Sequence, residues 1–138
     1  MTGKTKMEFN VSAQRLDAHG GLARCKESSI TLDTDLAGRR DAFNPAELLL
    51  AALGACMLKG IERVVPILKF ELQGVDIRLH AIRQDVPPRI EAIDYEIVVA
   101  SGESDRRLEL LHTNVKQYGT VFNTVAPGTK LDGTLRRA

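Results

Sequence analysis

Residues 44–60 read NPAELLLAALGACMLKG, and this stretch predicts the central helix of the fold. Asn44 is a favoured N-cap, Pro45 suits the first helical position, and Glu47 completes a capping box. The residues that follow are apolar on nearly every side, which is typical of a helix that is buried on most sides. Such a helix, of about 20 residues, is roughly 30 Å long. One chain of 138 residues has little material to enclose it, so we expect a homodimer.

Alternating apolar residues on both sides of this helix predict strands. Five strands are expected, over residues 6–13, 22–33, 75–81, 93–99 and, after a turn, within 127–137. A second helix is expected within residues 101–119, with Ser104 or Asp105 as its cap. The element order is therefore β-β-α-β-β-α-β. Because the strands come in hairpins, we predict an α+β fold in a single domain over residues 1–138.

Charge and cysteine content exclude several classes of protein. Nineteen basic and eighteen acidic residues leave a net charge of +1, which gives no electrostatic basis for binding nucleic acid or an anionic membrane. The first ten residues lack the apolar segment of a secretory signal, and the longest apolar run, residues 48–58, is too short to span a bilayer. Two cysteines make no disulfide framework and have no metal-site spacing. We predict a cytoplasmic protein without a metal or a cofactor.

Cys56 lies about three turns into the predicted central helix. A helical cysteine can simply fill space, or, when ionised, act as a nucleophile. Cys25 shares a strand face with Ala23, and core packing explains it adequately. His19, His80 and His112 stand on three different predicted elements, and a structural role is expected for each.

Two motifs connect Cys56 to a known family. NPAELLLAALGACM at residues 44–57, VKQYGTVFNTV at residues 115–125 and the element order are similar to those of the OsmC/Ohr family, the osmotically inducible protein C and organic hydroperoxide resistance proteins. The resemblance implies antiparallel sheets around a long central helix and an intertwined homodimer. It also implies that Cys56 is a reactive thiol of a peroxiredoxin-like antioxidant protein of the oxidative-stress response, which reduces organic hydroperoxides.

The chain departs from the peroxidase branches of that family at two positions. Gly119 and Thr120 stand where those branches carry a second, resolving cysteine followed by proline, so a divergent branch without the second cysteine is expected. Ala46 stands where those branches carry a glutamate that holds an arginine against the thiolate. Glu47 comes one residue later, which turns it to the opposite side of the helix from Cys56. We therefore expect Glu47 to act as a cap, or to serve the thiol only across a dimer.

An arginine for the thiolate has to come from the loop before the helix. That loop offers Arg39 and Arg40, and we favour Arg39 as the second catalytic residue, with solvated loop charges as the alternative interpretation. Without the family's glutamate, the guanidinium is expected to be poorly held.

Two functions stay open at this point. The first is a thiol-dependent peroxidase, in which Cys56 forms a sulfenic acid and an external thiol reduces it. The alternative is a non-enzymatic dimeric module that binds a small lipophilic ligand beside Cys56 or senses redox state. The departures at Ala46 and Gly119 support this alternative, but the peroxidase is the function that we favour.

Overall fold

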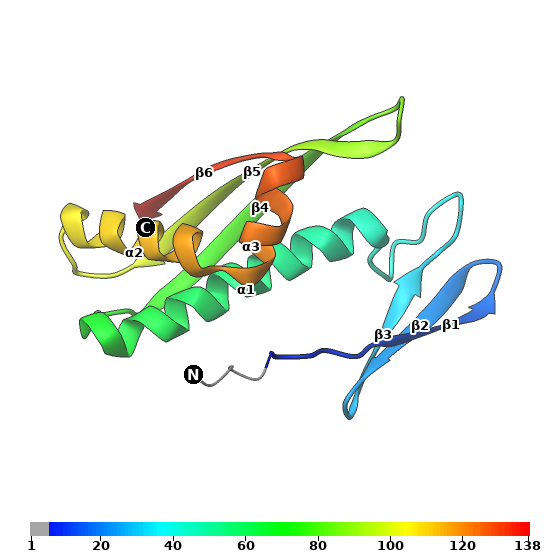
Figure 1. Cartoon of the computed structure of the whole chain (residues 1–138), viewed down its shortest axis with the longest axis horizontal. Coiled ribbons are helices and arrows are strands. Elements are labelled where there is room, and N and C mark those ends of the chain that lie inside the picture. Colours follow the sequence, from blue (N-terminus) through cyan, green and yellow to red (C-terminus); the bar gives the residue numbers. More distant parts are fainter. Residues whose placement is uncertain (1–5) are drawn as a thin grey trace. The chain divides into compact units, whose positions relative to one another are not determined.

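The computed structural model describes residues 6–138 and divides the chain into two compact units, with the boundary after Leu48. This boundary falls inside the first helix, α1 (Pro45–Leu68). The unit before it contains β1 (Ser12–Asp17), β2 (Gly20–Cys25) and β3 (Ser28–Asp33). These strands form an antiparallel sheet in the order β1-β2-β3 (Figure 1).

Two strand predictions in this unit are wrong in their bounds. The segment 22–33 is not one strand but most of a hairpin, because Lys26 adopts the left-handed conformation (φ 56°) and reverses the chain between Cys25 and Ser28. No glycine, proline or asparagine marks this turn, so the sequence pattern does not indicate it. The first strand begins only at Ser12. The apolar side chains that alternate in residues 7–11 are exposed and form no strand.

The unit after the boundary contains the longer strands β4 (Gly74–Gln84), β5 (Arg89–Ala100) and β6 (Lys130–Arg137), in the order β4-β5-β6. β4 and β5 are an antiparallel hairpin, as predicted, but β6 runs parallel to β5. The expectation of purely antiparallel sheets is therefore corrected to a mixed sheet. The physical reason is the connection, since residues 101–129 form a crossover long enough to return the chain in the same direction.

This crossover contains α2 (Asp105–Tyr118), α3 (Thr120–Val125) and a 3₁₀ turn (Ala126–Gly128). Ser104, one of the two predicted caps, accepts a hydrogen bond from the Arg107 N–H at 3.3 Å. The segment VFNTV follows the range predicted for the second helix. It forms the separate helix α3, because Gly119 has extended dihedrals (φ −78°, ψ 118°) and interrupts the helix there. The α+β class is confirmed, with the observed order β-β-β-α-β-β-α-α-β.

One side of α1 supplies the core of this unit. Its fully buried side chains recur at helical spacing and join side chains of β5 and α2 in one hydrophobic cluster, at Leu53, Met57, Ile61 and Val64. The other sides of α1 are not enclosed: Leu58 is 44% exposed and Ile67 65% exposed. A single chain therefore leaves part of this apolar helix exposed, as expected from its length and composition.

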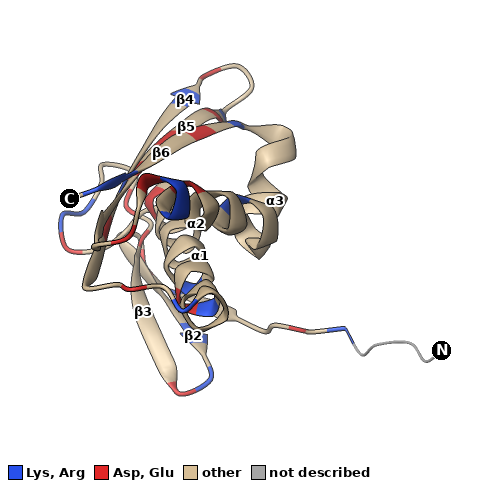
Figure 2. Cartoon of the chain, turned by 90° about the vertical axis from the view of Figure 1, so that its left-hand side faces the viewer, with Lys and Arg blue, Asp and Glu red and all other residues tan. Residues whose placement is uncertain are grey.

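Charges of both signs are interspersed along the ribbon (Figure 2). On the outer side of the β4–β5–β6 sheet, His80 pairs with Asp94 at 2.8 Å and Arg136 with Glu96 at 3.2 Å. Within residues 6–138, the helices fall short of the length and apolarity that a membrane crossing needs.

The predicted capping box at the start of α1 is confirmed. Asn44 N–H donates to Glu47 Oε1 at 2.9 Å, and Glu47 N–H donates to Asn44 Oδ1 at 2.9 Å. The Glu47 carboxylate and the Asn44 amide oxygen therefore each satisfy a backbone N–H at the helix start.

We expect Glu47→Ala to lower the free energy of unfolding by about 1 kcal/mol, because the reciprocal cap is lost. Glu47→Gln keeps an acceptor for the Asn44 N–H and should lose much less. Urea denaturation of both variants at equal protein concentration measures the difference. Equal stability of Glu47→Ala and the wild type would contradict the capping role.

Candidate functional site

Cys56 lies on α1, half-buried, against the backbone at the junction of α2 and α3. A Cβ placed on Gly119 would lie 3.0 Å from Cys56 Sγ, 3.0 Å from Phe122 Cβ and 3.1 Å from the carbonyl oxygen of Val115. The dihedrals of Gly119 are open to any residue, so space, rather than backbone conformation, favours glycine here. The fold thus brings the two sequence motifs together at the sulfur.

A partly buried polar pair lies next to this junction. The Tyr95 hydroxyl, from β5, is 2.6 Å from Nε2 of His112 on α2. Burial, followed by the negative charge of Asp132, raises the pKa of Tyr95 to about 12. Burial, followed by the positive charge of Lys116, lowers the pKa of His112 below 6.5. At neutral pH the Tyr95 hydroxyl is therefore the donor and the neutral imidazole the acceptor.

The same tyrosine also contacts the helix that covers the thiol. The rings of Tyr95 and Phe122 meet edge to face, with centroids 6.3 Å apart. The sequence predicts a structural role for His112 and gives no sign that Tyr95 lies near Cys56. The two residues are 17 positions apart on different elements, and no sequence spacing predicts their contact.

Arg39 belongs to the unit before the boundary and is firmly held. Its Nε donates to Asp41 Oδ1 at 2.9 Å, and its Nη2 donates to Asp41 Oδ2 at 2.8 Å. Its backbone N–H donates to the buried carboxylate of Asp33 at 2.9 Å. A Cβ on Gly20 would collide with Nη1, so the guanidinium lies directly over that glycine.

The expectation that this arginine is poorly held is therefore wrong. Asp41 supplies the bidentate carboxylate that Ala46 cannot, and the hydrogen bond from Arg39 lowers the pKa of Asp41. Arg40 is exposed in the same loop. The pairing of Arg39 with Cys56 stays a prediction, because the two residues lie in different units.

The remaining predicted residues have local roles. Cys25 ends β2 and pairs with Ser28 across the hairpin. His19 Nδ1 lies 2.7 Å from Asp35 Oδ2, beside the loop that carries Arg39, and His80 lies on the outer sheet face. In the described part of the chain, no three His, Cys, Asp or Glu side chains are grouped to hold a metal ion.

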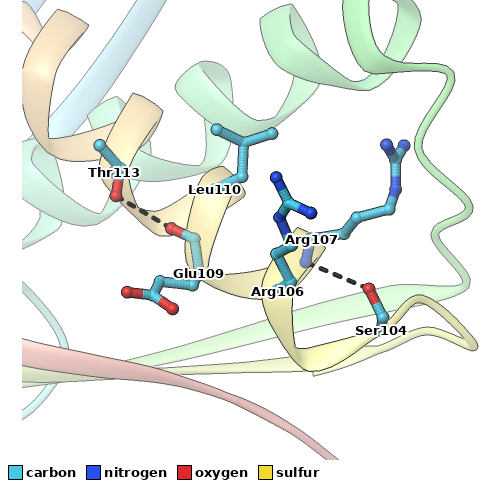
Figure 3. A pocket seen from close by; sticks show the side chains of 6 residues that line it. All are labelled: Ser104, Arg106, Arg107, Glu109, Leu110 and Thr113. Carbon is cyan, nitrogen blue, oxygen red and sulfur yellow. Dashed lines mark hydrogen bonds between the residues drawn. The ribbon is translucent and has the colours of Figure 1, made fainter.

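An open recess of about 640 Å³ runs along α2, lined by Ser104, Arg106, Arg107, Glu109, Leu110 and Thr113 (Figure 3). Arg107 is committed to the fold, because it donates to Glu103 Oε1 at 2.7 Å and to the carbonyl oxygen of Leu68, at the end of α1, at 2.6 Å. This second bond stabilises the C-terminus of α1. We therefore place the candidate site at Cys56 and not at this recess.

The sequence model of the family described as OsmC-like protein matches residues 38–133, which include the Arg39 loop, Cys56 and Gly119. The chain belongs to the OsmC-like family. This confirms the family that the sequence motifs indicated. No match was found among curated proteins.

Solved structures share the fold at low sequence identity. An OsmC-like protein from Mycoplasma pneumoniae is 17% identical, with a TM-score of 0.88, and the match covers 97% of this chain and 99% of that one. A hypothetical protein from Aquifex aeolicus VF5 is 22% identical, with a TM-score of 0.80 and coverage of 96% and 98%. An organic hydroperoxide resistance protein OsmC from Legionella pneumophila is 17% identical, with a TM-score of 0.75 and coverage of 96% and 99%.

The contact between Cys56 and Gly119 predicts that a thiol at position 119 will form a disulfide. The 3.0 Å between the Cβ position of Gly119 and Cys56 Sγ is close to the separation that a disulfide imposes between one sulfur and the Cβ of its partner. After diamide treatment, we expect Gly119→Cys to lose two hydrogens by intact mass, with the bond mapped to Cys56.

Thr124→Cys, at an exposed position of α3, is the matched control and should form no such bond. The wild type should give only mixed disulfides with added small thiols. An intrachain bond between Cys25 and Cys56 in the wild type would contradict the expectation that Cys56 acts without a partner in its own chain.

Proposed function

We propose that this OsmC-like protein is a thiol-dependent peroxidase that reduces organic hydroperoxides at Cys56. The observation that carries the proposal is the placement of Cys56 Sγ, half-buried on α1 and packed against Gly119, where the two family motifs meet. The printed descriptions of structural relatives from Legionella pneumophila, Elizabethkingia anophelis and Bacillus subtilis as organic hydroperoxide resistance proteins support the same activity.

The reaction needs one reactive sulfur and an external reductant. The Cys56 thiolate attacks the terminal oxygen of ROOH, so that an S–O bond forms, the O–O bond breaks and the alkoxide leaves with a proton as ROH. The resulting sulfenic acid reacts with one external thiol, releasing water and forming a mixed disulfide. A second external thiol then releases Cys56 and carries away the disulfide of the reductant.

The surroundings of the sulfur favour an apolar hydroperoxide. Cys56 packs against the hydrophobic cluster, and Phe122 lies beside it at the α2–α3 junction. The transfer of an alkyl group from water into such surroundings has a favourable free energy, whereas hydrogen peroxide has no apolar group to transfer.

Arg39 is the cation that we assign to the thiolate and to the departing alkoxide. Asp41 occupies its Nε and one N–H of Nη2, while Nη1 makes only a long contact of 3.4 Å with the His19 carbonyl oxygen. The guanidinium thus keeps donors available for an anion while its orientation is fixed.

The experiment is the rate of cumene hydroperoxide reduction with a small dithiol as reductant. Cys56→Ser should abolish the reaction. Asp41→Asn should lower the second-order rate constant about 10-fold, equivalent to about 1.4 kcal/mol of barrier. The reason is that the Arg39 guanidinium loses the bidentate carboxylate that orients it.

The chain contains a matched control for this variant. Arg83 and Asp85 form a second Arg-x-Asp pair, at 3.2 Å, and Asp85→Asn removes the same charge from it. This variant should leave the rate unchanged. If the wild type reacts no faster than free cysteine, the peroxidase proposal fails, and the alternative of a non-enzymatic module for a lipophilic ligand or redox sensing is favoured.

We further propose that the protein is a homodimer in solution. The exposed apolar side chains of α1, Leu49, Leu58 and Ile67, support this assembly, since a second subunit would remove them from water. Light scattering at micromolar concentration should give twice the chain mass, and the melting temperature should rise with protein concentration. A folded monomer with a concentration-independent melting temperature would contradict the dimer.

A further inference from the structure

Tyr95 connects the β5–β6 sheet to both helices that meet at the thiol. Its ring lies over Gly133, its register partner on β6, where a Cβ would collide with the ring. Its hydroxyl bonds His112 of α2 at 2.6 Å, and its ring meets Phe122 of α3 edge to face. One side chain therefore holds α2 by a hydrogen bond and α3 by an aromatic contact.

The helices that Tyr95 holds are joined by Gly119, which contacts Cys56. His112 precedes Val115 by one helical turn, and the Val115 carbonyl, Phe122 Cβ and Cys56 Sγ all lie within 3.1 Å of the Cβ position of Gly119. A shift of the last turn of α2 or of α3 would therefore change the space over the sulfur. The contacts form a continuous path from Tyr95 to Cys56.

The hydrogen bond fixes a position that apolar packing alone leaves adjustable. Around it, the buried side chains of α2, Leu108, Leu111 and Val115, are aliphatic. Aliphatic contacts tolerate small sliding movements, whereas the partly buried hydroxyl and imidazole satisfy each other only within hydrogen-bond geometry.

We propose that Tyr95 and His112 are positioning residues for Cys56: their hydrogen bond holds the α2–α3 junction against the sulfur and so sets the access of peroxide and reductant to it. The consequence for catalysis rests on the peroxidase function proposed above. The positioning itself is independent of that function and is measurable on the thiol.

Tyr95→Phe tests the bond with the ring retained. We expect modification of Cys56 by N-ethylmaleimide to become about 10-fold faster and hydrogen exchange at residues 119–122 to increase, because the junction loosens. The rate of hydroperoxide reduction should nevertheless fall, because the sulfur is no longer held in one position for its attack on the peroxide. Cys25, in β2, is an internal control whose modification rate should not change, and peptide mapping separates the two thiols.

Tyr118→Phe is the matched control variant. Tyr118 ends the same helix but is 57% exposed, with Arg63 over its ring, and the loss of its hydroxyl should not affect Cys56.

A double variant distinguishes positioning from a purely structural role. Tyr95→Phe leaves the His112 imidazole without its donor, and adding His112→Leu removes that unsatisfied group, so stability should recover. Access to Cys56 should stay high, because the directional bond is still absent. If the Tyr95–His112 pair had only a structural role, the double variant would instead regain both its stability and the protection of Cys56.

Three results would overturn the inference: unchanged Cys56 modification and unchanged exchange in Tyr95→Phe, an equal acceleration at Cys25, or full thiol protection in the double variant. A wild type without peroxidase activity, combined with the expected change in Cys56 modification, would support the positioning and contradict only the proposed function.

Discussion

The burial of one side of α1 is the constraint on which the rest of its unit depends. Leu53, Met57, Ile61 and Val64 enter a cluster with the inward side chains of β5 and α2, and each such side chain stabilises the fold by about 1.5–3 kcal/mol when fully buried. This packing fixes the rotation of the helix about its own axis. Because Cys56 directly precedes Met57, the same rotation leaves its sulfur half-buried at the edge of the core, under the α2–α3 junction.

Three glycines leave room for the side chains that the proposed chemistry uses. The Arg39 guanidinium lies over Gly20, the Cys56 sulfur against Gly119 and the Tyr95 ring over Gly133. At each position a Cβ would collide with, or crowd, the neighbouring group. Arg39, Cys56 and Tyr95 therefore each pack against backbone, which moves less than a neighbouring side chain would.

The carboxylate that holds the arginine also has a local origin. Asp41 is two residues from Arg39 and accepts hydrogen bonds from Nε and Nη2, along one edge of the guanidinium, while the buried Asp33 accepts the Arg39 backbone N–H. The departure at Ala46 therefore does not leave the guanidinium loose. It changes which element orients the arginine, from the central helix to the loop that precedes it.

The sequence by itself determined the capped central helix, the place of Cys56 on it, the β4–β5 hairpin and the family. Capping residues, strict alternation and a compact motif act over a few neighbouring residues. It missed the turn at Lys26, which a left-handed lysine forms without the usual turn residues, and the separate helix after Gly119. Only the tertiary structure decided that β6 runs parallel to β5, that Asp41 grips Arg39, and that Tyr95 bonds His112 beside the thiol junction. The direction of β6 and the Tyr95–His112 contact depend on how distant segments pack against each other. The hydrogen bonds between Arg39 and Asp41 depend on the course of an irregular loop. No periodicity in the sequence specifies either kind of contact.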